Sequence, residues 1–464
     1  MWPFASKSRR PAASRPPHRR EVSYRPRLEA LEDRRLLSAG ALDTTFGGTG
    51  VVATSLSKGS DTAWTSLLQP NGDIVTAGLT VSGSHKTPSF ALVAYTPSGS
   101  LDTTFGSGGE VITPSTNLSL GIRIAAAEYS STDTSGNANK IVEVGVVNGT
   151  ITMARYNPNG TLDTTFGTKG LATVAINQTV GSVAIQPDGK IVVGGAANGP
   201  ANSSFAVSRF NTDGSLDTTF GINGQVLTSI PGGGSISSLL VQPDGKIVAG
   251  GQGYYDTYNT QTLPEFTLAR YNSDGSLDST FGSEGIVHTL WPGTGSGSST
   301  LNGLALESTG QIVAVGMASP SNPGGHAWAL ARYNSDGSLD STFGSGGLVT
   351  LDIPISYDFH NNAAQSVAVQ SNGELVVLGT AYDANINHTF AVVTLTATGA
   401  LDPAFGGSGW VLGTDNSATS AMSTMNVLVQ ADGKIVVTGA LPDSSKRGAS
   451  DFALARYDGT TTGL

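Results

Sequence analysis

The sequence contains no cysteine, few charged residues and no long apolar run. Without cysteine the chain has no disulfide, no thiolate nucleophile and no zinc site built from cysteine. Charged residues make up only 13% of the 464 residues. No stretch approaches the ~18 consecutive apolar residues that cross a membrane, so we expect no membrane span. Glycine occurs 61 times, about twice its usual frequency, and the composition favours strands and turns over helices.

Positive charge is concentrated at the start of the chain. Residues 1–40 hold ten Lys or Arg residues against four acidic ones, and the remainder holds 15 basic and 31 acidic residues. An acidic body repels the phosphate backbone of nucleic acids, so we expect no nucleic-acid partner. The Pro, Ser and Arg content of residues 1–40 is typical of a disordered leader. This leader lacks the continuous apolar core of a secretory signal peptide.

A short motif of the form LDxxFG divides the rest of the sequence into repeats of 54–62 residues. Each unit holds four short runs rich in Val, Ile, Phe and Tyr and bounded by Gly, Asn or Asp, a pattern that predicts four β-strands. One stretch, LARYNSDGSLDSTFG, occurs twice, at 268–282 and 330–344. Such repetition indicates that the motif has a structural role, because a catalytic motif is normally needed only once. The motif begins at Leu42, Leu101, Leu162, Leu216, Leu277, Leu339 and Leu401.

Four strands cannot bury both faces of their own sheet, whereas sheets stacked radially bury them against one another. We therefore predict an all-β fold in which residues 41–464 form a seven-bladed β-propeller of four-stranded blades, preceded by a disordered tail over residues 1–40. The last unit ends at its third strand, 451–457, and the run 48–55 is left over at the other end. We expect these N- and C-terminal strands to pair and to close the ring.

The Asp of the motif is present in every unit, and an Arg stands eight residues before it in four of them. This constant spacing predicts a structural Arg–Asp pair at the edge of each blade. Arg456 has no Asp eight residues further on, and we expect Asp43 to supply its partner. The arginines are Arg155, Arg209, Arg270 and Arg332, and Ala94 or Thr394 stands in their place in two units.

Two resemblances accompany this pattern. The segments QPDGKIVVGG (186–195), FTLARYN (266–272) and DGSLDTTFG (213–221) resemble the delta-60 repeat, a β-propeller domain of unknown function. That resemblance implies an exported bacterial protein and brings no established catalytic residue. The segment RPRLEALEDRRLLSA (25–39) resembles the LEPR-XLL segment of large exported bacterial proteins, although Asp33 replaces the family's Pro. It implies an extracellular or cell-surface location.

Two kinds of candidate site have simpler explanations. Asn272, Asp274 and Asp278 offer oxygens at a spacing suited to calcium, but turn formation alone explains Asn, Asp and Gly there. Four histidines fall in the fifth and sixth units without any metal-binding spacing. We therefore expect no catalytic residue, no metal ion and no cofactor, and hence no enzyme. The histidines are His288, His326, His360 and His388.

The connections that vary between units are expected to share one end of the propeller, and they carry most of the candidate binding residues. Repeats that hold one face constant and vary the other usually bind with the varied face. We expect a non-enzymatic scaffold that binds a glycan or a protein there; a polysaccharide-active enzyme and a purely structural envelope component are the alternatives. The candidate residues are Tyr254, Tyr255, Tyr258, Trp291, Tyr357, His360 and Tyr382.

Overall fold

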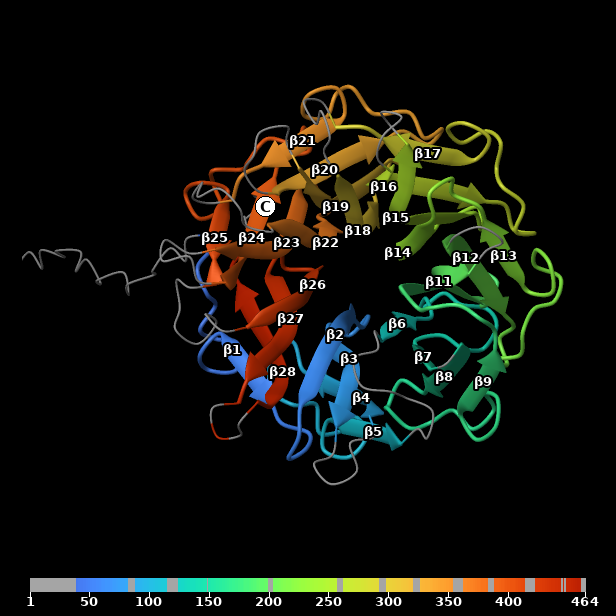
Figure 1. Ribbon diagram of the computed structural model, residues 1–464. Coiled ribbons are helices and arrows are strands. Elements are labelled where there is room, and N and C mark those ends of the chain that lie inside the picture. The colour runs from blue at the N-terminus through green and yellow to red at the C-terminus, as the bar shows by residue number, and fades with distance from the viewer. Residues whose placement is uncertain are drawn as a thin grey trace, which may run out of the picture. The chain divides into compact units, whose positions relative to one another are not determined.

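The computed structural model describes residues 39–81, 88–114, 124–147, 149–198, 203–256, 262–291, 298–319, 326–353, 362–382, 388–413, 422–443, 445 and 448–459. The chain divides into two units, residues 1–37 and 38–464, and the first unit lies outside the described residues. In the second unit, seven antiparallel four-stranded sheets are arranged as blades in a ring (Figure 1). The described ranges contain no α-helix, and no helix in them is long and apolar enough to cross a membrane. The predicted seven-bladed, all-β fold is confirmed.

Within each blade, the strands are ordered from the centre of the ring to its outer edge. The innermost strands are β2 (Asp61–Leu68), β6 (Ala125–Glu128), β10 (Ser182–Ile185), β14 (Gly234–Val241), β18 (Ser299–Leu306), β22 (Ala363–Val369) and β26 (Ser423–Val429). The second strands are β3 (Ile74–Val81), β7 (Ile141–Val147), β11 (Ile191–Asn198), β15 (Ile247–Asp256), β19 (Ile312–Ala318), β23 (Leu375–Tyr382) and β27 (Ile435–Pro442). The third strands are β4 (Pro88–Tyr95), β8 (Thr150–Tyr156), β12 (Ser203–Phe210), β16 (Thr262–Tyr271), β20 (Ala327–Tyr333), β24 (His388–Leu395) and β28 (Ser450–Tyr457). The outer strands are β5 (Glu110–Pro114), β9 (Leu171–Ala175), β13 (Gln225–Thr228), β17 (Ile286–Thr289), β21 (Leu348–Leu351), β25 (Trp410–Leu412) and β1 (Val51–Thr54).

The two ends of the propeller chain meet in the seventh blade, whose strand order is β1-β28-β27-β26. Val51 lies opposite Ala455 and Val52 lies opposite Leu454 in the antiparallel ladder of β1 and β28. The blade that lacks an outer strand of its own therefore takes it from the start of the propeller. The predicted closure of the ring is confirmed.

In each of five blades the innermost strand has a β-bulge, and the second strand has a glycine opposite it. In blade 4 the register of β14 and β15 shifts between Ile236 and Ser238, as it does at the same place in four other blades. A Cβ atom on Gly251 would lie 1.9 Å from the carbonyl oxygen of Ser235. The second glycine of runs such as IVAGG thus permits the close approach of two backbones.

The core consists of seven apolar clusters, and each cluster lies between two neighbouring blades. In one of them Phe166 of blade 2 packs with Val193 and Phe210 of blade 3. The cluster between blades 7 and 1 joins Phe452 to Phe46, which is fully buried. Because every interface has its own core, the loss of one interface opens the ring.

The strand order gives the propeller two different ends. The Pro-Asp-Gly and Asn-x-Asp-Gly turns, which follow the innermost and the third strands, share one end, here called the turn end. The connections from second to third strand, and from outer strand to the next blade, share the opposite end, here called the loop end. The hairpin of β15 and β16 runs further toward the loop end than its neighbours, because each of its strands has 10 residues.

Candidate functional site

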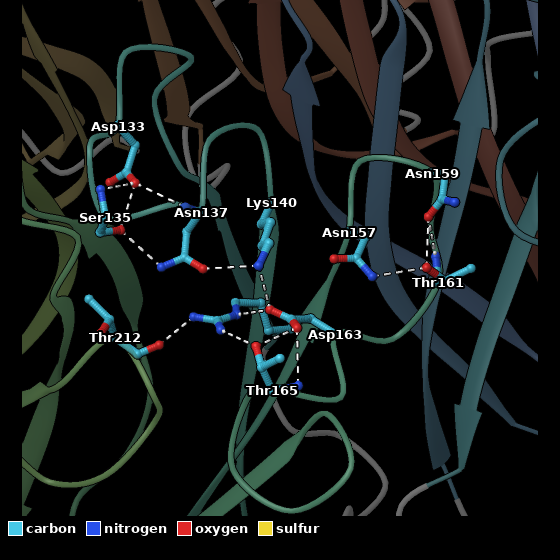
Figure 2. A network of polar contacts seen from close by, with 11 residues as sticks. Asp133, Ser135, Asn137, Lys140, Asn157, Asn159, Thr161, Asp163, Thr165 and Thr212 are labelled. Atoms are coloured by element: carbon cyan, nitrogen blue, oxygen red, sulfur yellow. Dashed lines mark hydrogen bonds and ion pairs between the residues drawn. The ribbon is translucent and has the colours of Figure 1, made fainter.

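A polar network built on the Asp of the LDxxFG motif lies at the turn end of five blades. Figure 2 shows it in blade 2, where Asp163 Oδ2 accepts hydrogen bonds from Lys140 Nζ and Arg155 Nε, both at 2.8 Å. The other carboxylate oxygen accepts the backbone N–H and the hydroxyl of Thr165. Arg155 Nη1 donates to the carbonyl oxygen of Thr212 in the next blade. The network therefore joins two blades as well as the strands of one.

The same arrangement recurs with little change. The Arg Nε–Asp Oδ2 distance is 2.7–2.9 Å in blades 2, 3, 4, 5 and 7, and each guanidinium lies 4.5–4.7 Å from the centre of a phenylalanine ring. Burial alone would raise the pKa of Asp278, but hydrogen bonds from Lys246 and Thr280 hold it well below its usual value. Asp43 does supply the partner of Arg456. The Arg–Asp pairs are structural, as the spacing predicted.

The Asn-x-Asp-Gly turns use their polar side chains within the turn. Asp274 Oδ1 accepts the backbone N–H of Ser276 at 2.9 Å and its hydroxyl at 2.7 Å. Asn272 donates to the same hydroxyl at 3.0 Å, and Asp278 belongs to the network just described. Turn formation thus accounts for these residues, and in the described part of the chain no three His, Asp or Glu side chains converge on one point.

A cavity of about 210 Å³ lies on the ring axis and is lined by all seven innermost strands. No described residue of its lining is titratable. Several of its polar side chains join neighbouring blades: Ser182 Oγ accepts the N–H of Leu239 at 3.1 Å, and Ser238 Oγ accepts that of Leu304 at 3.2 Å. This lining is suited to holding the blades together and offers no general acid or base.

The loop end of blade 4 brings together residues from three of its strands. The imidazole of His288 in β17 stacks on the ring of Tyr255 in β15, with ring centres 4.5 Å apart and planes inclined by 18°. His288 Nδ1 lies 3.1 Å from Glu265 Oε2 of β16, and this hydrogen bond raises the pKa of the imidazole. The side chain of Glu265 is 3% exposed, whereas that of His288 is 49% exposed. A half-exposed aromatic pair therefore rests on a buried carboxylate.

Three of the predicted binding residues can be placed in full, and all three lie at the loop end of blade 4. Tyr254 and Tyr255 are partly exposed. Trp291 is only 5% exposed and packs edge-on against Phe266 in the core between blades 4 and 5. The expectation that Trp291 offers surface to a ligand is therefore corrected.

The remaining predicted residues are placed only in part. Tyr382 ends β23 opposite His388, and its side chain lies outside the described residues, as do Tyr258, Tyr357 and His360 altogether. Sequence analysis missed Glu265 as a partner of His288, because the two are 23 residues apart and meet only through the register of β16 and β17. Glu265 lies in the longest hairpin and His288 lies in the strand that follows it, and this proximity in the repeat was the available signal.

Glu128 is a second acidic group that the sequence analysis did not single out. It ends the innermost strand β6 at the turn end, where it lines a cavity of about 630 Å³ together with Ile185, Val241 and Leu306. Burial raises its pKa from 4.5 to about 7. The folded protein therefore binds this proton more tightly than the unfolded chain does.

We expect the substitution Glu128→Gln to stabilise the protein in a pH-dependent manner. Below about pH 4.5 the carboxyl is protonated in both states and costs nothing, whereas above about pH 7 the folded state carries the cost of a partly buried charge. The free energy of unfolding in urea should be unchanged at pH 4 and higher by about 1–2 kcal/mol at pH 8, allowing for solvent screening. An equal gain at both pH values would contradict the assigned protonation.

The fold and the polar network define the protein as a β-propeller of tandem repeats joined by ion pairs. The family model described as a domain of unknown function (DUF5122) beta-propeller matches residues 69–105, 139–166, 186–220, 242–281, 307–343, 370–405 and 430–459. These segments cover more than half of the chain, and the chain belongs to this family. The first six matches end at the Phe of LDxxFG. The seventh ends at 459, because its Asp and Phe come from the start of the propeller.

Solved structures are similar in fold only. The polysaccharide lyase Uly1 aligns with a TM-score of 0.52 at 12% identity, over 85% of this chain and 90% of its own. A protein of unknown function from Dyadobacter fermentans aligns with a TM-score of 0.45 at 9% identity, over 88% and 97%. Chaetomium thermophilum Sqt1 aligns with a TM-score of 0.47 at 14% identity, over 88% and 97%. No curated protein matches the chain.

Proposed function

We propose that the protein is an exported, non-enzymatic binding scaffold that holds a glycan at its loop end. The observation that carries the proposal is the stacked pair of Tyr255 and His288, which is partly exposed, joins the longest hairpin to β17 and is supported by a buried carboxylate. An aromatic face next to hydrogen-bonding groups provides flat contact with a sugar ring at little entropic cost. The export of the chain rests on the resemblance of residues 25–39 to the LEPR-XLL segment.

Binding is favoured over catalysis by the chemistry of the axial cavity. Enzymes that hydrolyse polysaccharides normally place two carboxyl groups on either side of the scissile bond. The described lining of the axial cavity provides none. The cavity at the turn end is lined by two, Glu128 and Asp133, but Asp133 Oδ1 accepts the backbone N–H and the hydroxyl of Ser135 within its own turn. These features support a scaffold whose repeats supply rigidity and whose loops supply recognition.

A protein ligand is the second candidate. Leu290 is 52% exposed and directly follows β17 at the same end. An exposed apolar side chain next to aromatic ones is typical of the centre of a protein interface. The array experiment below distinguishes the two ligand classes.

The test is to apply the purified full chain to a glycan array and to a peptide array. We expect binding to a restricted set of glycans and an affinity at least about 10-fold lower for the variants Tyr255→Ala and His288→Gln, with thermal midpoints close to that of the parent, since the glutamine keeps a donor for the buried carboxylate of Glu265. The matched control is Ile222→Ser, because Ile222 is 82% exposed and lies away from the loop end. Binding to peptides alone would replace the glycan by a protein ligand, and binding that Ile222→Ser abolishes but Tyr255→Ala does not would refute the proposed surface.

A further inference from the structure

The innermost strands end at the turn end in a ring of seven equivalent positions, and one of these positions holds an acid. Each residue of the ring lies opposite the first residue of the second strand in its blade, and all seven are partly exposed. In blade 2 the residue is Glu128, and in the other blades it is apolar. Such a departure from the rule of the repeat is typical of a functional position. The apolar members of the ring are Leu68, Ile185, Val241, Leu306, Val369 and Val429.

Blade 2 also differs in the turn that follows Glu128. In the other six blades the connection from the innermost to the second strand is as short as 186–190 in blade 3, whereas in blade 2 it runs from 129 to 140. This enlarged turn is held by its own hydrogen bonds. Asp133 Oδ1 accepts the backbone N–H of Asn137 at 3.2 Å, and Lys140 Nζ donates to Asn137 Oδ1 at 3.1 Å (Figure 2). The acid of the ring and the enlarged turn are therefore adjacent features of one blade.

Together the enlarged turn and part of the ring line the cavity of about 630 Å³ at the turn end. Its volume is in the range that is usual for sites of small organic ligands. Pro187 and Pro243 belong to its lining and are exposed, as is Thr132 of the enlarged turn, so the cavity is open to solvent. The ring contributes Glu128 and three apolar residues, Ile185, Val241 and Leu306.

The carboxyl group of Glu128 has no counter-charge among the described residues. Its Oε1 is buried and accepts no hydrogen bond in the described part of the chain, and burial accounts for its raised pKa. The other acid of the lining, Asp133, is occupied by the backbone and hydroxyl donors of its own turn. The described lining contains no Lys or Arg. A cation in the cavity therefore gains a carboxylate partner in apolar surroundings, where their attraction is stronger than in water.

We propose that the cavity at the turn end binds a small organic ammonium ion with an apolar body. Glu128 is the partner of the ammonium group, and Ile185, Val241 and Leu306 form the contact surface for the apolar body. An ammonium group offers three N–H donors, and its hydrogen bonds to a carboxylate are charge-assisted and strong. Burial of the apolar body against the aliphatic side chains adds to the affinity.

The charge of the chain and the composition of the cavity both favour this class of ligand. Residues 41–464 hold 15 basic and 31 acidic residues, an excess of negative charge that attracts cations and repels anions. A calcium ion is less suited, because it takes 6–8 oxygen ligands and Glu128 is the one carboxyl group of the described lining that its own turn does not occupy. The amine and the proposed glycan bind at opposite ends of the propeller, so either proposal can fail without the other.

The experiment titrates the full chain with phenethylamine and with phenethyl alcohol and follows the NMR signals of each probe. The titration is made at about pH 8, because burial raises the pKa of Glu128 to about 7 and the carboxyl is then largely ionised. The two probes share a phenyl ring and a two-carbon chain and differ in charge, so we expect the amine to bind at least about 10-fold more tightly. Equal affinities for the two probes would overturn the proposal, as would the absence of amine binding at about 10 mM.

Two variants of Glu128 locate the binding. Glu128→Leu restores the apolar type of residue that the other six ring positions hold, and it is therefore expected to fold; Glu128→Gln removes the charge alone. Both should weaken the binding of phenethylamine at least about 10-fold. Asp188→Asn is the matched control, because Asp188 is an exposed acid in the short turn of blade 3 that does not line the cavity, and it should leave the affinity unchanged. Unchanged amine binding by Glu128→Leu, or an equal loss in Asp188→Asn and Glu128→Gln, would refute the site.

Discussion

A chain that begins at residue 56 is expected to unfold at least about 10 °C below a chain that begins at residue 39. The longer truncation removes β1, together with Asp43 and Phe46. Arg456, which is 6% exposed, then loses its carboxylate, at a cost of about 3–5 kcal/mol. The loss of Phe46 from the core between blades 7 and 1 costs about as much again. Differential scanning calorimetry of the two chains measures the difference.

A peptide of residues 39–55 provides the control for this truncation. Added to the chain that begins at residue 56, it should pair with β28 and restore most of the lost thermal midpoint. The same peptide with Asp43→Asn and Phe46→Ser should not. Equal thermal midpoints for the two truncated chains would show that β1 does not close the ring.

The substitution Arg270→Ala is expected to lower the free energy of unfolding by about 3–5 kcal/mol, because it leaves a buried carboxylate without its main partner. Asp278 is 4% exposed, and Arg270 also donates to the carbonyl oxygen of Ser335 in the next blade. Arg270→Lys should recover only part of the loss. An ammonium lacks the fork of N–H groups that reaches both Asp278 Oδ2 and the carbonyl oxygen of Ser335.

Lys246→Ala is the matched comparison within the same network. The lysine side chain is 30% exposed and approaches the same oxygen of Asp278 at 2.9 Å, so its removal should cost no more than about 1 kcal/mol. Urea unfolding at pH 7 measures all three variants. If Lys246→Ala lowered the free energy of unfolding as much as Arg270→Ala does, the burial of the basic side chain would not determine how much each ion pair stabilises the fold.

The architecture could be predicted from the sequence because the repeats form the same contacts between the same motif positions. The spacing of eight residues between Arg and Asp fixed the ion pairs, and the missing partner of Arg456 identified Asp43 and the closing strand. These inferences needed only the order of strands within one unit. The ladder of Val51 and Val52 with β28 followed from the same count.

The candidate binding site was less accessible to such reasoning, because its contacts do not repeat. Trp291 stands in a loop rich in Pro and Gly and was expected at the surface, yet its apolar ring folds onto Phe266. His288 and Glu265 are joined by strand register rather than by spacing. The bulges of the innermost strands were also missed, since the bulged positions hold side chains as different as Trp64 and Ser237.

Hydrogen–deuterium exchange of the full chain, with and without the glycan bound most tightly on the array, tests most directly whether the ligand lies at the loop end. The account predicts slower exchange at residues 251–256, 262–268 and 286–291, which carry the Tyr255–His288 pair and its support. It predicts no change in the turns at 242–246 and 272–276. Slower exchange confined to those turns would contradict it.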